Sequence, residues 1–177
     1  MMRIRRARKL DRDGISDVHL SAFPDGEGEI VSKLAISLLS ERTTPQTISL
    51  VYEADGNVVG HVAFSPVTID NNDDLTGYIL APLGVKPDFQ KRRIGSGLIE
   101  SGMQQLLAMD VNLLLVYGDP GYYRKFGFSA DIADRYIPPY KLQYPFGWQA
   151  IVLNECTVEK SPIRITCVTS LCDPKLW

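Results

Sequence analysis

The chain has 177 residues, of which 45% are hydrophobic and 23% charged, and its formal net charge is −2 at pH 7. These values are ordinary for a folded protein with a sizeable core, so they exclude a globally disordered chain and give no general attraction to nucleic acid or to an anionic membrane. No apolar run reaches the length of about 18 residues that a membrane span needs, and no apolar stretch follows the basic N-terminus, so we expect neither a membrane span nor a signal peptide. The three cysteines form no C-x-x-C pair, so we expect no zinc site. These features together predict a cytoplasmic protein.

Two helices are predicted after a short strand at the N-terminus. Residues 2–8 read as a strand near a sheet edge, and the apolar spacing that follows predicts a helix from Asp11 to Phe23. Asp11 and Asp13 are the candidate N-caps of this helix. A Pro- and Gly-containing break then separates it from a second helix, which precedes the loop at residues 42–46.

Three strands joined by short turns come next. Asp55-Gly56 is the strongest hairpin signal in the chain, because this dipeptide suits a tight turn between antiparallel strands. Pro66 implies a bend or an edge position in the second strand. We therefore predict an antiparallel meander, with strands at residues 47–53, 58–69 and 77–85.

A basic stretch leads from the third of these strands into a helix. Pro87 ends the strand, Lys91-Arg92-Arg93 follow, and Gly95 and Gly97 lie where the helix begins. Such a loop is suited to phosphate, because free backbone N–H groups and the positive end of the helix dipole point the same way. Neither a Walker A element nor a Rossmann fingerprint is present. On the residues alone, a solvated charge run is an equal alternative.

The rest of the chain predicts one parallel crossover and a late β-rich segment. The helix runs to about Met109, and residues 111–117 are a near-continuous apolar run typical of a strand buried on both faces. Strand, helix and strand in this order imply parallel pairing. A turn at residues 118–121, with Asp119 as a possible cap, precedes a short helix over Tyr122–Phe126. Residues 138–147 read as a loop, and final strands are predicted at 148–154 and 163–169.

Two motifs resemble a known family. The segment from Gly118 to Phe128, with Tyr123 four residues before Gly127-Phe128, resembles a late segment of the GNAT-type N-acetyltransferases. The similarity is strongest to a subgroup of predicted bacterial acetyltransferases whose substrates are poorly defined. The other match, to the acetyl-CoA pyrophosphate motif of that family, is made by Val85, Pro87, Gln90, Ile94, Gly95, Ser96 and Leu98.

The resemblance implies a GNAT fold of the α/β (α+β) class. It would have a mixed, mostly antiparallel central sheet, flanking helices, and one parallel crossover that splays at the acyl-CoA site. Residues 1–177 would form a single domain, with 130–177 as C-terminal strands and loops. Acetyl-CoA would be the co-substrate, with no metal, and a backbone N–H near Leu83–Val85 would stabilise the oxyanion. The implied cofactor-binding residues are Leu83, Gly84, Val85, Gln90, Lys91, Arg92, Arg93, Ile94, Gly95 and Ser96.

One position departs from the family pattern. Aligned on Gln90, the loop has Arg93 where the family has its first glycine. A shifted match, Arg92-x-x-Gly95-x-Gly97, satisfies the pattern but displaces it from Pro87. In the Gln90 register, Arg93 must adopt a compatible backbone without the conformational freedom of glycine.

The resemblance also assigns catalytic roles. Tyr123 matches the tyrosine that protonates the departing thiolate, and the alternative is that it packs in an aromatic cluster with Tyr122, Phe126 and Phe128. Glu29 and His61 are weaker, substrate-lining candidates. Glu29 could instead be a helix N-terminal carboxylate, and His61 a satisfied packing residue.

The predicted activity is transfer of an acetyl group from acetyl-CoA to an amine by direct attack on the thioester. The alternative is an acyl-CoA-binding sensor or interaction module without turnover. The acceptor would be a small molecule or a peptide, O-acetylation stays open, and so does a homodimer. Residues 136–148 form either a packed loop or a wall of the acceptor site, and the C-terminal Trp177 is expected to dock on the body of the protein or on another subunit.

Overall fold

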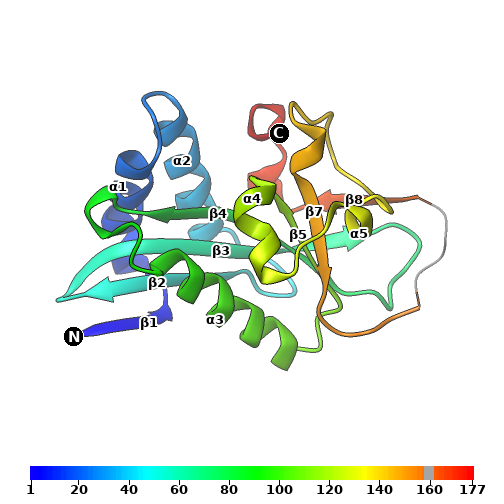
Figure 1. Cartoon of the computed structure of the whole chain (residues 1–177), viewed down its shortest axis with the longest axis horizontal. Helices are drawn as coiled ribbons and strands as arrows, with labels where there is room; N and C mark the ends of the chain where they lie inside the picture. The colour runs from blue at the N-terminus through cyan, green and yellow to red at the C-terminus, as the bar shows by residue number, and fades with distance from the viewer. Residues whose placement is uncertain (158–161) are drawn as a thin grey trace. The chain divides into compact units, whose positions relative to one another are not determined.

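The computed structural model describes residues 1–157 and 162–177 (Figure 1). The chain divides into two compact units, of which the first is Met1–Phe64 with Ala81–Gly102 and the second is Ser65–Leu80 with Met103–Trp177. Strands β3 (Asn57–Ile69) and β4 (Gly77–Val85) and helix α3 (Ile94–Ala108) contribute residues to both units. No helix in the described residues combines the length and the apolar character that crossing a membrane requires.

The sheet is mixed and mostly antiparallel, as predicted. Its strand order is β1 (Met2–Arg6), β2 (Ile48–Ala54), β3, β4, β5 (Leu113–Tyr117) and β7 (Trp148–Val152). Strand β8 (Ile163–Cys167) pairs with both β3 and β6 (Tyr136–Ile137) away from this path. The pairs β1–β2, β2–β3, β3–β8 and β5–β7 are antiparallel, whereas β4 and β5 pair in parallel across the helix that joins them. The predicted crossover is therefore confirmed.

In the first unit, a tight hairpin joins β2 (Ile48–Ala54) to β3. Asp55 and Gly56 have φ angles of 48° and 80°, which is the left-handed backbone that a two-residue hairpin turn requires. The turn that the Asp-Gly dipeptide predicts is thus present. Strand β1 (Met2–Arg6) pairs with the other side of β2 and forms the edge.

Helices α1 (Arg12–Ala22) and α2 (Glu27–Ser40) follow β1. Of the two predicted N-caps of α1, Asp13 is wrong because it lies inside the first turn, and Asp11 has the predicted position but not the predicted bond. Asp11 stands at the N-cap position without a side-chain cap hydrogen bond. Its buried carboxylate instead accepts two hydrogen bonds of 2.8 Å from the Arg5 guanidinium and one of 2.6 Å from the Arg8 backbone. A bidentate, charge-assisted hydrogen-bonded pair is stronger than a hydrogen bond from a neutral backbone N–H. The Asp11 carboxylate therefore binds the Arg5 guanidinium and does not cap α1.

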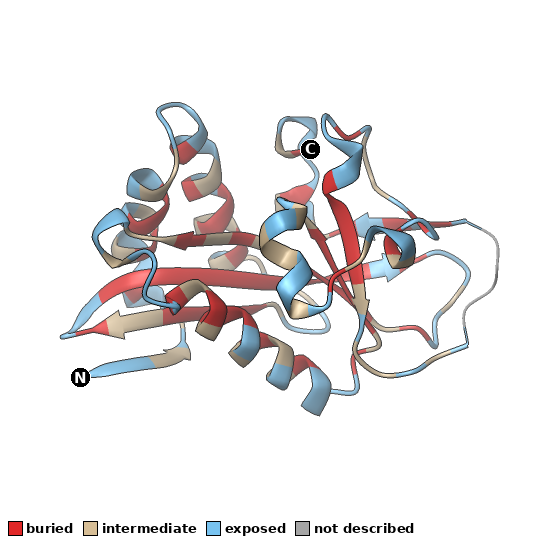
Figure 2. Ribbon diagram, in the orientation of Figure 1, coloured by how far each residue is buried: buried red, intermediate tan, exposed pale blue. Residues whose placement is uncertain are grey.

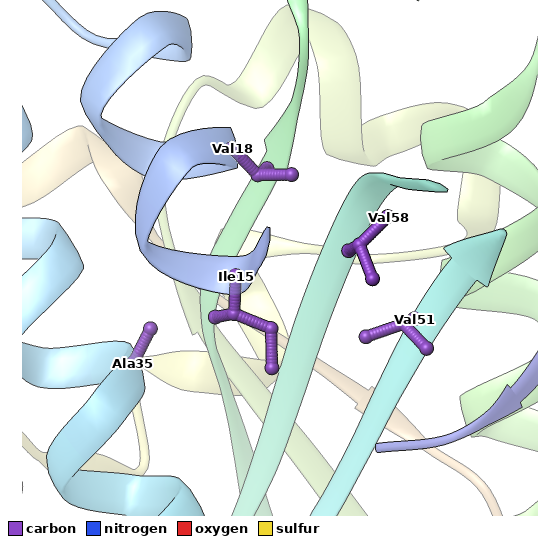
Figure 3. Packing of buried hydrophobic residues seen from close by; sticks show 5 residues of the cluster. All are labelled: Ile15, Val18, Ala35, Val51 and Val58. Atoms are coloured by element: carbon purple, nitrogen blue, oxygen red, sulfur yellow. The ribbon is translucent and has the colours of Figure 1, made fainter. Parts of the chain in front are cut away.

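A small hydrophobic core holds α1 and α2 on the sheet. Figure 3 shows side chains from both helices and from β2 and β3 converging in it. Burial of such aliphatic side chains supplies most of the stability of helices of this length, which are marginal on their own. The members drawn are Ile15, Val18, Ala35, Val51 and Val58.

Glycines let α3 pack on the opposite face of the same strands. Gly60 of β3 faces Ile94, because a Cβ added to that glycine would lie 2.9 Å from the isoleucine side chain. Gly102 of α3 lies so close to Phe64 that an added Cβ would be 2.1 Å from the ring. His61, the residue after Gly60, points to the α1 face because neighbours along a strand alternate.

The second unit is built around β5 (Leu113–Tyr117) and β7 (Trp148–Val152), which Figure 2 shows as largely buried. Strand β8 (Ile163–Cys167) was expected from the sequence. Helix α5 (Ala130–Ala133) and strand β6 (Tyr136–Ile137) were not, because elements of four and two residues carry too little periodic pattern to be recognised. The predicted helix at Tyr122–Phe126 is α4 (Pro120–Tyr123) followed by a 3₁₀ turn.

The C-terminal Trp177 packs against the body of its own chain, within the second unit, which was one of the two predicted positions. The Trp177 ring is 6.1 Å from Tyr117 and 6.0 Å from Trp148, measured between ring centroids. Its indole N–H donates a 3.0 Å hydrogen bond to the Leu171 carbonyl. An aromatic residue with a satisfied N–H and only 8% exposure is part of the core.

We predict that Gly102→Ala destabilises the protein by about 1–3 kcal/mol, because the added methyl group would overlap the buried Phe64 ring. Gly97→Ala, on the same helix, is the matched control, since its added Cβ meets nothing closer than 3.4 Å and alanine favours the helix. Urea unfolding of both variants measures the difference. Equal stabilities would contradict the close packing of α3 on Phe64.

Candidate active site

The basic loop is held to the end of β4 by local hydrogen bonds. The Lys86 backbone N–H donates to the Val59 carbonyl at 2.9 Å, and a 3₁₀ turn at Pro87–Phe89 reverses the chain. The Gln90 side-chain amide then donates back to the Val85 carbonyl at 3.1 Å. Gln90 therefore braces the loop against the strand from which the loop leaves.

Arg93 takes the conformation that glycine would supply. Its φ is 62°, and that of Lys91 is 59°, so both residues lie in the left-handed region although neither is glycine. A residue with a Cβ pays roughly 1–2 kcal/mol for this backbone. Arg93 thus adopts the glycine-like backbone that the sequence predicts there, and the backbone is strained as a result. Backbone strain of this kind is typical of functional loops.

The loop presents backbone amides and cations together. The Gly97 N–H bonds to the Arg93 carbonyl at 2.9 Å, so residues 94–96 form the first turn of α3, where N–H groups have no partner within the helix. Lys91, Arg92 and Arg93 are exposed, and the Arg92 guanidinium lies 5.3 Å from the centre of the Phe89 ring. These groups fit a pyrophosphate, because amides, dipole and positive charge act at one place.

Tyr123 belongs to the second unit and is the last residue of α4, the short helix that follows β5. Asp119 caps α4 by accepting a 2.8 Å hydrogen bond from the Gly121 N–H. A Cβ at Gly118 would lie 2.5 Å from the Tyr123 ring, so the ring packs directly on that glycine. The ring also contacts Tyr122 and Phe128, with centroids 5.1 and 5.7 Å away. Burial, with smaller effects from Tyr122 and Asp119, raises the pKa of Tyr123, so its hydroxyl stays protonated at neutral pH.

His61 is part of a buried hydrogen-bond chain in the first unit. Its Nδ1 is 2.8 Å from His19 Nε2, and its Nε2 is 2.8 Å from Ser49 Oγ. Both imidazoles are completely buried. Burial lowers the pKa of His19 to about 4, and burial followed by the charge of His19 lowers that of His61, so both rings are neutral at pH 7.

Sequence reasoning missed His19, although a signal was available. Ile15, Val18, His19 and Ala22 have the three- and four-residue spacing of one helix face, which marks His19 as a polar residue on the buried side of α1. Of the other candidates, Glu29 lies exposed in the first turn of α2. Within residues 1–157 and 162–177, no group of three His, Cys, Asp or Glu side chains could hold a metal ion.

Known proteins match both the sequence and the fold. The family model described as an acetyltransferase (GNAT) domain matches residues 45–130. The uncharacterized N-acetyltransferase YjhQ of Escherichia coli is 32% identical over 76% of this chain and 74% of its own length. This protein is a member of the GNAT acetyltransferase family.

Solved GNAT structures agree with this assignment. YhbS of E. coli, crystallised with CoA, has a TM-score of 0.74 at 27% identity, over 86% of this chain and 81% of its own. A GNAT acetyltransferase from Brucella melitensis, in complex with acetyl-CoA, has a TM-score of 0.66 at 32% identity, over 92% of this chain and 94% of its own. The family and fold predicted from the sequence are confirmed, whereas the roles of individual residues stay predictions.

The buried histidines predict a specific pH dependence of stability. The pKa of His19 falls from an ordinary value of 6.5 to about 4 on folding, so between these values the unfolded chain binds more protons than the folded one. The free energy of unfolding should therefore drop by roughly 3 kcal/mol as the pH falls from 7 to 4, with a further loss from His61. Urea unfolding across this range measures the slope, and His19→Asn should flatten it. An unchanged slope in that variant would contradict the assignment.

Replacement of Arg93 by glycine should relieve strain in the loop. We expect Arg93→Gly to raise the free energy of unfolding by roughly 0.5–1 kcal/mol, which is the left-handed penalty less the entropy that glycine adds to the unfolded chain. Arg92→Gly is the matched control, because Arg92 is not among the residues with positive φ and glycine there should destabilise. Thermal unfolding of both variants gives the sign, and destabilisation by both would contradict the prediction.

Proposed function

We propose that this GNAT protein transfers the acetyl group of acetyl-CoA to an amine of a small molecule or peptide. The observation that carries the proposal is the loop at the end of β4, where left-handed backbone at Lys91 and Arg93 accompanies free helix amides and three cations. CoA and acetyl-CoA in the YhbS and Brucella structures support the same ligand here.

In this proposal, the loop holds the cofactor and β4 orients it. The backbone amides of residues 91–96 would bind the pyrophosphate, with Gln90 keeping the loop on the strand through Val85. A backbone N–H of Leu83–Val85 would donate to the thioester oxygen as negative charge develops there. Bound acetyl-CoA would supply the acetyl group in an activated form, as a thioester.

We assign the proton donor to Tyr123. A neutral phenol can donate to a thiolate, and the Tyr123 hydroxyl, whose pKa burial raises, is protonated at neutral pH. Gly118 supports the role, because it allows the ring to pack against the backbone that follows β5. Packing with Tyr122 and Phe128 is compatible with the same role.

Fewer residues can be proposed for the part of the site that contacts the acceptor amine. We place Glu29 as a surface carboxylate through which an ammonium acceptor loses its proton by way of water, because it is exposed at the start of α2. Tyr144 and Phe146, 53% and 66% exposed, suit a wall that contacts the acceptor. The three free cysteines fit a cytoplasmic setting, and a homodimer is compatible with the proposal.

The strained loop favours one alternative. Arg93 occupies a position suited to glycine, so cofactor could bind without efficient turnover, as in an acyl-CoA sensor. Calorimetric titration with acetyl-CoA, followed by a screen of amines for release of free thiol, separates the two functions. Binding without turnover on any amine would favour the sensor, and absence of binding would refute both.

Removal of the Tyr123 hydroxyl tests the mechanism. We expect Tyr123→Phe to lower kcat by roughly 10²–10⁴-fold, the usual contribution of a positioned acid, while acetyl-CoA affinity stays near that of the parent. Tyr122→Phe is the matched control and should retain activity. Free-thiol release under saturating acetyl-CoA measures both variants. If Tyr123→Phe turns over like the parent, the assignment of the acid is wrong.

A further inference from the structure

The two histidines of this chain are hydrogen-bonded to each other in the interior. The sequence contains His19 and His61 and no other histidine, and both are completely buried. The chain of contacts runs from Ser49 on β2, through His61 on β3, to His19 on α1, with both links 2.8 Å long. Side chains from β2, β3 and α1 thus form one continuous chain of hydrogen bonds in the interior.

One end of this hydrogen-bond chain has no hydrogen-bond partner. Among the described residues, His19 Nδ1 is a buried polar atom without a hydrogen bond. Such atoms are rare, because a buried polar group that loses water without gaining a partner is costly. An unpartnered nitrogen at the end of an otherwise complete chain therefore points to a ligand that completes it.

The position of this nitrogen indicates which ligand. A Cβ added to Gly84 would lie 2.7 Å from His19 Nδ1 and 2.9 Å from the neighbouring ring carbon. The nitrogen consequently lies against the backbone of β4, at the centre of Leu83–Val85, and only glycine allows this approach. The same three residues are those proposed to hold the thioester.

We propose that His19 donates a hydrogen bond from Nδ1–H to the thioester oxygen, as a second donor beside the backbone N–H of Leu83–Val85. The inference rests on the proposed acetyl transfer. It requires one arrangement of protons, in which the Ser49 hydroxyl donates to His61 Nε2 and His61 Nδ1–H donates to His19 Nε2. Ser49 and His61 are then positioning residues that keep the proton of His19 on Nδ1.

A neutral imidazole suits this role. Donors that are fixed before the reaction, in a site without water, stabilise developing negative charge without reorganising. An imidazole kept neutral by its surroundings polarises a carbonyl without adding a full charge to the interior. The opposite arrangement of protons would leave a lone pair on His19 Nδ1, which could only accept a hydrogen bond.

Nitrogen NMR of the parent chain with ¹⁵N-labelled histidine distinguishes the two arrangements, because two histidines give only four ring nitrogens. We expect His19 Nδ1 and His61 Nδ1 to carry the protons, with both Nε2 atoms unprotonated, and His61→Asn assigns the signals. Acetyl-CoA should shift the His19 Nδ1 signal more than any His61 signal. An unprotonated His19 Nδ1, or no shift when calorimetry shows acetyl-CoA bound, would overturn the inference alone. Absence of acetyl-CoA binding would overturn the proposed function with it.

Two substitutions of His19 distinguish a hydrogen-bond donor to the thioester from a residue that only packs in the interior. An asparagine amide reaches about as far as Nδ1 of histidine, and a glutamine amide about as far as Nε2. His19→Gln should therefore keep the link to His61 and lose the donor, lowering kcat by roughly 10²–10³-fold with little change in KM for acetyl-CoA. His19→Asn should retain more activity. Equal losses in both, or better activity in His19→Gln, would contradict the inference.

Ser49 supplies an independent check of the proton arrangement. Ser49→Ala removes the hydroxyl that donates to His61 Nε2, so protons should redistribute over the two rings and kcat should fall. Ser49→Thr restores a hydroxyl and should recover both the NMR signature and most of the activity. A normal proton arrangement in Ser49→Ala would show that Ser49 does not position His61.

Discussion

Close packing of aromatic and imidazole rings against glycine backbone fixes the spacing between elements in both units. Phe64 lies on Gly102, His19 on Gly84 and Tyr123 on Gly118, each at a distance that a Cβ would not permit. The first contact sets how near α3 comes to the sheet, and the other two place polar rings at strand ends. Because interiors are densely packed, a single added methyl group at such a contact would displace a whole element.

Polar chemistry in this protein is divided between solvent and interior. The cations of the loop are exposed, where water stabilises their charge and they can meet a phosphate. His19 and His61 are buried and therefore neutral, so they contribute directed hydrogen bonds without net charge. Arg5 and Asp11 show the third solution, a bidentate pair in which each partly buried charge neutralises the other.

Local features were predictable where a few neighbouring residues decide the backbone. Asp55-Gly56 predicts its own turn, and the order of strand, basic loop and helix around Gln90 and Arg93 predicts a phosphate-type loop. The absence of a cap hydrogen bond from Asp11 was not predictable, because its partner Arg5 belongs to another element and competes with the helix terminus. Short elements such as α5 and β6 form because their neighbours pack on them, which a local pattern does not report.

The order of elements, the GNAT motifs and Tyr123 as a candidate acid could all be predicted from the sequence, since each depends on spacing along the chain. Folding alone brings Ser49, His61 and His19 together in one buried hydrogen-bond chain that ends against Gly84. His19 and His61 are 42 residues apart and lie on a helix and a strand, so no local pattern joins them. Burial removes water, so His19 bonds to His61, and His61 bonds to both His19 and Ser49.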